Sequence, residues 1–206
     1  MVQKSSNENF FIGLSLSNSS NYDSSVCVLD RNSKILLLDK FYFTQDIELF
    51  FQTSPYIHKS LFCVSVPYDN SLLDGKWRIH SKNYKMLGDY FKINRQKWTK
   101  RLSNRLCGAL LDLHEEGVKV FRCDINQLRQ AYGLNAHYLS RTSLDCKNLQ
   151  TSLKLKYNFA ELPENMLAAS SLEAIICAMF AKYISFGGET SNMFDFEGLE
   201  VLSKPF

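Results

Sequence analysis

The sequence predicts an α/β domain in which a mixed sheet carries helices on both faces. Three short apolar runs separated by polar turns come first, which is typical of an antiparallel meander. Helical and strand patterns then alternate, which is typical of parallel strands joined by helices. With 206 residues, 45% of them hydrophobic, the chain is long enough for one packed domain. We therefore expect a five-stranded sheet, the meander plus parallel strands, in a single domain over residues 10–206.

The N-terminal part supplies the meander. Residues 1–9 are polar and are expected to form a flexible tail. Turn-rich NSSNYDSS (18–25) and Arg31–Ser33 separate the apolar runs, and such polar clusters favour reversal of the chain. The predicted strands are Phe10–Ser17, Ser25–Asp30 and Lys34–Phe43.

A helix and a buried strand follow the meander. Thr44 is expected to cap a helix over Gln45–Gln52, and the continuous apolar run Leu61–Val66 predicts a buried strand that ends at Pro67. An irregular excursion is expected over residues 68–97.

The C-terminal half predicts the helices that cover the sheet. Glycines at 117 and 133 and the pair 187–188 follow periodic apolar segments and are expected to end helices. Asp124 is expected to cap the second of these helices. The predicted elements are a helix over Arg95–Glu116, a strand over Val118–Cys123, helices over Ile125–Tyr132, over Cys146–Lys156 and from Ser170 or Ser171 to Phe186, and a strand near Leu199–Leu202.

Composition restricts the cellular setting. No apolar leader follows Met1 and no apolar run is long enough to span a bilayer, so we expect a soluble, cytoplasmic protein without membrane contact. The six cysteines are scattered and are expected to be buried and reduced. The spacing of cysteines and histidines does not match a structural zinc motif, and nucleotide-binding motifs are absent. We expect no cofactor.

Several segments, in order, resemble a known family. FIGLSL (11–16) is similar to an opening strand I-G-[IV]-D-L, and VSVP (64–67) to I-D-A-P. The segments 118–133 and 170–181 resemble a strand-plus-short-helix unit and the pattern D-x-x-D-A-[LI]-x-C-A-x-x-A, and 196–205 resembles E-G-x-I-x-x-P. The chain thus looks like a divergent member of a domain family of unknown function, predicted nucleases of the RuvC/ribonuclease H-like superfamily. The order of elements is also that of the ribonuclease H-like fold.

The resemblance implies four metal-binding carboxylates, of which this sequence keeps one. Ser15, Ser65 and Arg122 occupy three of the positions, and Glu173 occupies the fourth. A hydroxyl is a weak neutral ligand and a guanidinium repels cations, whereas two-metal nuclease sites use clustered carboxylates. The resemblance therefore implies a catalytically degenerate protein that serves as a binding or structural subunit and holds no metal.

The alternative is a nuclease that uses displaced acids. Asp69, Asp124 and Glu173 would then hold Mg²⁺ or Mn²⁺ near the carboxyl ends of the strands. Each also has a structural explanation: Asp69 suits a turn, Asp124 a helix N-cap, and Glu173 the first turn of a helix.

A basic, aromatic region supplies the candidate contact surface. Residues 76–105 contain ten Lys or Arg and one acid, although the whole chain carries only +3. Cations between flat rings suit nucleic acid, and an acidic protein surface or a merely solvated helix face would also account for them. Homo-oligomerisation stays open. The candidate residues are Lys76, Trp77, Arg78, Lys82, Lys85, Arg95, Lys97, Lys100, Arg101 and Arg105.

Overall fold

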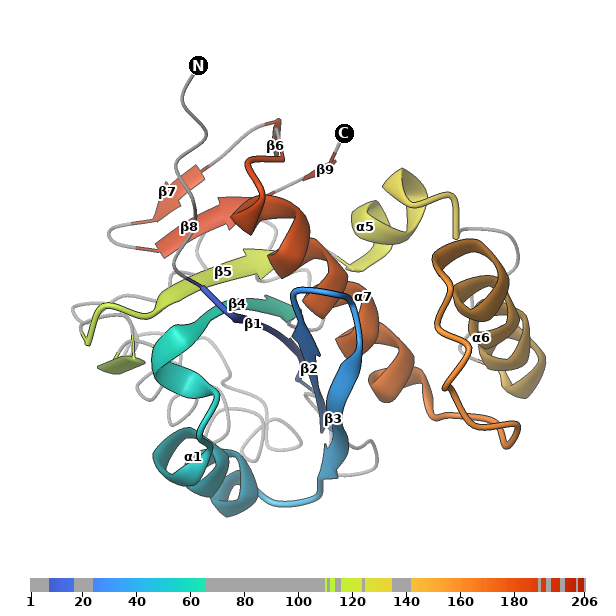
Figure 1. Cartoon of the computed structure of the whole chain (residues 1–206), viewed down its shortest axis with the longest axis horizontal. Helices are drawn as coiled ribbons and strands as arrows, with labels where there is room; N and C mark the ends of the chain where they lie inside the picture. Colours follow the sequence, from blue (N-terminus) through green and yellow to red (C-terminus); the bar gives the residue numbers. More distant parts are fainter. Residues whose placement is uncertain are drawn as a thin grey trace, which may run out of the picture.

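A seven-stranded mixed sheet forms the centre of the fold (Figure 1). The computed structural model describes residues 8–16, 24–65, 110, 112–113, 116–123, 125–134, 142–188, 190–191, 194–196, 199–202 and 204–205. The strands lie in the order β3-β2-β1-β4-β5-β8-β7. Their bounds are β1 Phe10–Ser15, β2 Ser24–Asp30, β3 Ile35–Phe41, β4 Ser60–Ser65, β5 Lys119–Cys123, β7 Phe194–Phe196 and β8 Leu199–Leu202.

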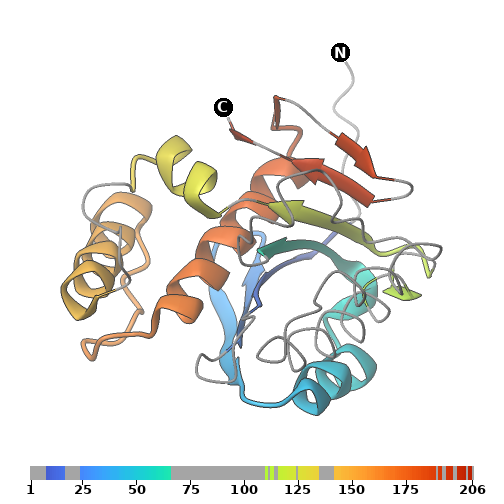
Figure 2. The ribbon, with the colours of Figure 1, turned by 180° about the vertical axis from the view of Figure 1, so that it is seen from behind.

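The pairing of the strands confirms the predicted mixed sheet. The β1–β2 and β2–β3 pairs are antiparallel, and the β1–β4 and β4–β5 pairs are parallel. These are the five strands of the expected sheet. The predicted last strand is β8, which pairs parallel with β5, and β7 adds an antiparallel edge that the sequence did not predict (Figure 2). A separate pair is formed by β6 (Thr190–Ser191) and β9 (Lys204–Pro205).

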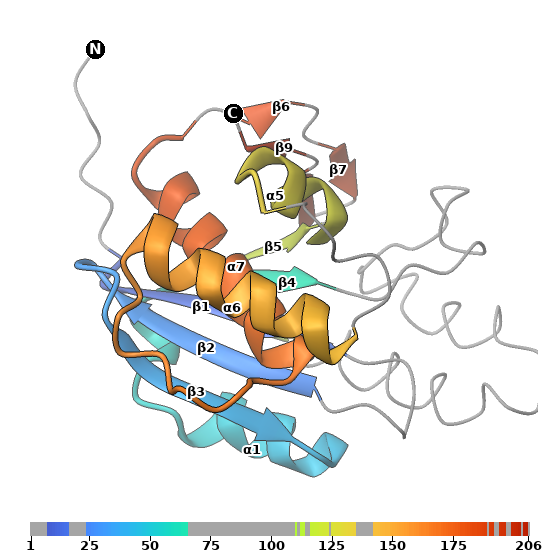
Figure 3. The same ribbon diagram turned by 90° about the vertical axis from the view of Figure 1, so that its right-hand side faces the viewer.

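The helices occupy the two faces of the sheet (Figure 3). Helix α7 packs on one face, together with α5 and α6, whereas α1 lies on the other. A short 3-10 helix over Ile57–Lys59 leads into β4. The helices span α1 Thr44–Thr53, α5 Ile125–Ala131, α6 Ser143–Tyr157 and α7 Ala169–Ser185.

Two helix starts differ from the prediction because their N-terminal hydrogen bonds come from other residues. Helix α1 already includes Thr44, and the carboxylate of Asp46 accepts from the backbone N–H groups of Tyr42 at 3.2 Å and Phe43 at 3.0 Å. Helix α6 begins three residues before Cys146, at Ser143. There the Thr142 hydroxyl accepts from the Asp145 N–H at 3.2 Å, and the Asp145 carboxylate accepts from the Thr142 N–H at 3.2 Å. This reciprocal arrangement is a capping box.

Alternating strand residues divide the core into two layers. Phe11, Leu61 and Phe121 face α7, whereas the intervening Ile12 and Phe62 face the layer that contains α1. Leu110 and Leu113, from the described end of the predicted 95–116 helix, join that second layer. Helix α7 is buried along most of its length, as expected for a helix that is apolar on nearly all sides.

Gly13 allows α7 to lie directly against β1. A Cβ atom at this position would lie 2.0 Å from the Ala174 carbonyl oxygen, 2.3 Å from the Ala178 nitrogen and 2.9 Å from the Cys177 carbonyl carbon. These are backbone atoms within one helix, so no flexible side chain can move aside. The absence of a side chain at Gly13 therefore sets the distance between the helix and the sheet.

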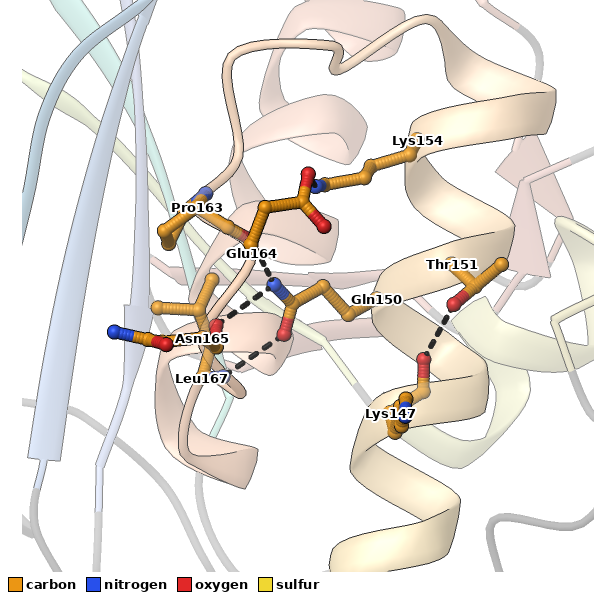
Figure 4. Close-up of polar contacts among 8 residues, drawn as sticks. All are labelled: Lys147, Gln150, Thr151, Lys154, Pro163, Glu164, Asn165 and Leu167. Carbon is orange, nitrogen blue, oxygen red and sulfur yellow. Dashed lines mark hydrogen bonds and ion pairs between the residues drawn. The ribbon is translucent and has the colours of Figure 1, made fainter.

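The segment that leads into α7 is held by one buried glutamine of α6 (Figure 4). The Gln150 amide nitrogen donates to the carbonyl oxygens of Pro163 at 2.6 Å and Asn165 at 3.1 Å, and its oxygen accepts from the Leu167 N–H at 2.8 Å. Lys154 and Glu164 form an ion pair at 2.8 Å beside it. These contacts fix the chain just before the first turn of α7.

Some expectations fall partly or wholly outside the described residues. This applies to residues 1–7 of the expected tail, the excursion at 68–97 and the predicted helix up to residue 109. Glu8 and Asn9 contact the domain, since Lys119 pairs with Glu8 at 2.7 Å and the Asn9 N–H donates to Lys59 O at 2.8 Å. Within the described part of the chain, no helix has the length and apolar character needed to cross a membrane.

Candidate functional site

A row of small polar residues crosses the sheet near the carboxyl end of β1. Ser15 is paired in register with Ser25 of β2 and with Ser65 of β4, and Ser65 is paired with Cys123 of β5. All four side chains are buried. Ser25, Ser15 and Ser65, which we call the serine row, therefore lie side by side, two of them at positions where the resemblance implies carboxylates.

The first turns of α7 cover the serine row. The Ser15 hydroxyl donates to Glu173 Oε2 at 2.9 Å, and Glu173 is only 1% exposed. The Ser25 hydroxyl donates to Ser170 Oγ at 2.9 Å and lies 3.2 Å from Ser171 Oγ. Neutral hydroxyls thus form the polar contacts between β2 and α7, and one carboxyl group is engaged by β1.

Four predicted site residues have different outcomes. The structure brings Ser15 and Glu173 into direct contact, although 158 positions separate them in the chain. Ser65 is buried next to Ser15, and its carbonyl oxygen accepts from the Leu16 N–H at 2.9 Å. Of Arg122 only the backbone is described, paired in register with Val64 and Val201.

The other predicted site residues lie outside the described residues. These are Asp69 and Asp124 of the displaced-acid alternative and the whole basic region, Lys76 to Arg105. Their roles stay predictions.

The described donors do not fit a two-metal site. Mg²⁺ and Mn²⁺ require several anionic oxygen ligands, and paired ions require carboxylates that bridge them. Around the serine row, the described residues offer the carboxyl group of Glu173 and neutral hydroxyls. No group of three His, Cys, Asp or Glu residues that includes Glu173 has ligand atoms close enough for one ion in the described ranges.

Sequence reasoning missed a second cluster, one helical turn further along α7. The thiols of Cys63, Cys123 and Cys177 are buried, and their sulfur atoms all lie within 4.8 Å of one another. Five of the six cysteines are described, and all five are buried thiols that are not joined in disulfides, which confirms that expectation for them. The cluster was missed because its members come from β4, β5 and α7, so no local spacing links them.

The described residues and their strand order define a ribonuclease H-like α/β fold. A comparison with solved structures confirms this class: the chain resembles the RuvC structure from Thermus thermophilus with a TM-score of 0.52, covering 86% of this chain and 96% of that one. The two sequences are 13% identical, so the likeness concerns the fold. No family model and no curated protein matches the sequence.

Proposed function

We propose that this protein is a catalytically degenerate ribonuclease H-like protein that acts as a binding or structural subunit. The observation that carries the proposal is the contact between Ser15 and Glu173. The acid that remains at the implied metal site is buried and accepts a hydrogen bond at 2.9 Å from a serine at an implied ligand position.

The chemistry of the serine row supports this function. A serine hydroxyl is neutral, so it offers a divalent cation little of the electrostatic stabilisation that a carboxylate provides. The hydroxyls of Ser25 and Ser170 are engaged with each other at 2.9 Å. Of the implied ligand positions, Ser15 and Glu173 instead join α7 to the sheet through their hydrogen bond.

The basic region is proposed as the contact surface, with nucleic acid as its partner. Its ten cations give it a strong local positive charge, and five aromatic residues lie among them in the sequence. Cations bind phosphates and aromatic rings stack on bases. An acidic protein surface is the alternative partner for the same charges.

The test combines retention and cleavage in one experiment. The full chain is mixed with labelled single-stranded, double-stranded and branched DNA and RNA, with Mn²⁺ or with a chelator. We expect salt-sensitive retention and no metal-dependent cleavage. Changing Lys97, Arg101 and Arg105 together to Glu should abolish retention. The logarithm of the binding constant falls linearly with the logarithm of the salt concentration. Neutralising one of the three residues should make this slope shallower by about 0.9 on duplex DNA, because one phosphate then keeps its counterion.

A matched variant controls for net charge. Three exposed lysines lie outside the basic region: Lys34, Lys59 and Lys147. Each change from Lys to Glu lowers the net charge by two, so this triple variant goes from +3 to −3, as the basic-region variant does. Equal loss of retention in the two triple variants would contradict a role for the basic region. Metal-dependent cleavage that disappears in Glu173→Gln would contradict degeneracy and favour the displaced-acid nuclease. Absence of retention would favour an acidic protein partner.

A further inference from the structure

The three buried thiols of Cys63, Cys123 and Cys177 form a compact set of sulfur donors. Their sulfur atoms lie within 4.8 Å of one another, and the Cys123 and Cys177 sulfurs are 3.4 Å apart. All three side chains are at most 1% exposed. Among the described residues, these three side chains are therefore close enough together to share one ion.

The topology of the sheet and the approach of α7 create the cluster. Cys63 pairs with Phe121, and Ser65 pairs with Cys123, so the two cysteines lie two positions apart on neighbouring parallel strands. Both therefore belong to the face that α7 covers. Gly13, the β1 partner of Cys63, lets the backbone of α7 at Cys177 reach the sheet.

The spacing of the sulfur atoms fits a single thiophilic ion. With Zn–S bonds of about 2.3 Å and tetrahedral angles, the ligand sulfurs of a zinc site are roughly 3.8 Å apart. The separations in this cluster, from 3.4 Å to within 4.8 Å, bracket that value. Thiolate sulfur is a soft donor, which favours Zn²⁺ and Cd²⁺ over Mg²⁺.

We propose that Cys63, Cys123 and Cys177 form a three-thiolate site for a soft divalent metal ion of the zinc class. The ion replaces the thiol protons, which leave to solvent, so that three Cys–S–H groups and M²⁺ give M(S-Cys)₃ and three H⁺. One negative charge remains on the site. This site is independent of the proposed function, since it uses neither Glu173 nor the basic region.

Burial determines how the site is filled. The side chains of Cys63 and Cys177 are fully buried. The thiols are inaccessible in the folded domain, and we infer that the ion enters as the chain folds. The experiment must therefore include refolding with metal.

The test uses the full chain, unfolded under reducing conditions and refolded with Cd²⁺ or Zn²⁺. Excess metal is removed by gel filtration, metal per chain is measured, and thiolate-to-cadmium charge transfer is recorded in the ultraviolet. We expect one ion per chain, a charge-transfer band, and a higher thermal midpoint than that of the metal-free protein. Cys63→Ala, Cys123→Ala and Cys177→Ala should each lose the band and the thermal shift.

Cys27→Ala is the matched control, because Cys27 is also fully buried on the α7 face of the sheet but lies outside the cluster. It should retain the ion. Circular dichroism checks that each variant folds, and serine replaces alanine where it does not. A wild-type protein that refolds without binding metal, or a band that Cys177→Ala and Cys27→Ala affect equally, would overturn the proposal.

Discussion

Gly13→Ala tests the packing that positions both the serine row and the thiol cluster. The added methyl would lie 2.0 Å from the Ala174 carbonyl oxygen and 2.3 Å from the Ala178 nitrogen, both in the backbone of α7. Overpacking of a core usually costs about 1–3 kcal/mol when side chains can adjust. Here a helix would have to move away from the sheet, so we expect a loss of at least about 3 kcal/mol from a total of roughly 5–15 kcal/mol.

The measurement is urea unfolding followed by circular dichroism, with Gly117→Ala as the control. Gly117 has φ of +89°, but no atom of the described residues lies within 4 Å of an added Cβ. Its substitution therefore isolates backbone strain, which we expect to cost about 1 kcal/mol. If Gly13→Ala costs no more than Gly117→Ala, α7 does not pack against β1 as described, and the geometry of both the serine row and the thiol cluster is wrong.

Two further predictions concern the segment before α7 and the contact between Glu8 and β5. Gln150→Ala removes three hydrogen bonds to the segment before α7, so it should lower the free energy of unfolding in urea by about 2–3 kcal/mol. The control is Thr151→Ala, on the exposed side of α6, which should change the free energy of unfolding by less than about 0.5 kcal/mol. Partial burial raises the pKa of Glu8, but its hydrogen bond and ion pair with Lys119 outweigh this and lower the pKa below its usual 4.5. The ion pair therefore stabilises the fold above pH 4.5, and this stabilisation is lost as the pH falls through the lowered pKa of Glu8. Lys119→Met should lower the free energy of unfolding by up to about 1 kcal/mol at neutral pH and should leave it unchanged in strong acid. An unchanged difference across the pH series would contradict the role of the ion pair.

Local signals account for what the sequence predicted well. Gly117 and Gly133 end helices with φ of +89° and +62°, the conformation that glycine adopts without strain. The polar turn at Arg31–Ser33 joins β2 to β3 as expected, with Ser33 at φ of 67°. The start of α6 carried a local signal too, since Thr142 and Asp145 are spaced as a capping box requires, but the prediction did not use it.

Contacts between distant segments explain what the sequence did not predict. The resemblance placed Ser15 and Glu173 in one site, and in the structure these two side chains do form a hydrogen bond. It did not indicate that Ser25 would join Ser170 across 145 positions. The thiol cluster depends on strand register and on the missing side chain of Gly13, neither of which composition or periodicity reveals.

The serine row and the thiol cluster both lie beneath α7, but only the thiol cluster is expected to bind a metal ion. Metal dependence can therefore be assigned to one or the other by experiment. At the serine row, the hydroxyls of Ser25 and Ser170 satisfy each other without an ion, so removing divalent metal should not weaken that contact. One turn along the helix, three buried thiols bring sulfur donors together, and an ion there would stabilise the fold. Refolding in the presence of a chelator therefore shows whether the stability of the fold depends on metal, and the variants show which of the two sites is responsible. A dependence abolished by Cys177→Ala and retained in Glu173→Gln belongs to the thiols, whereas the reverse pattern would show that Glu173 still holds metal and that the serine row is not a closed structural contact.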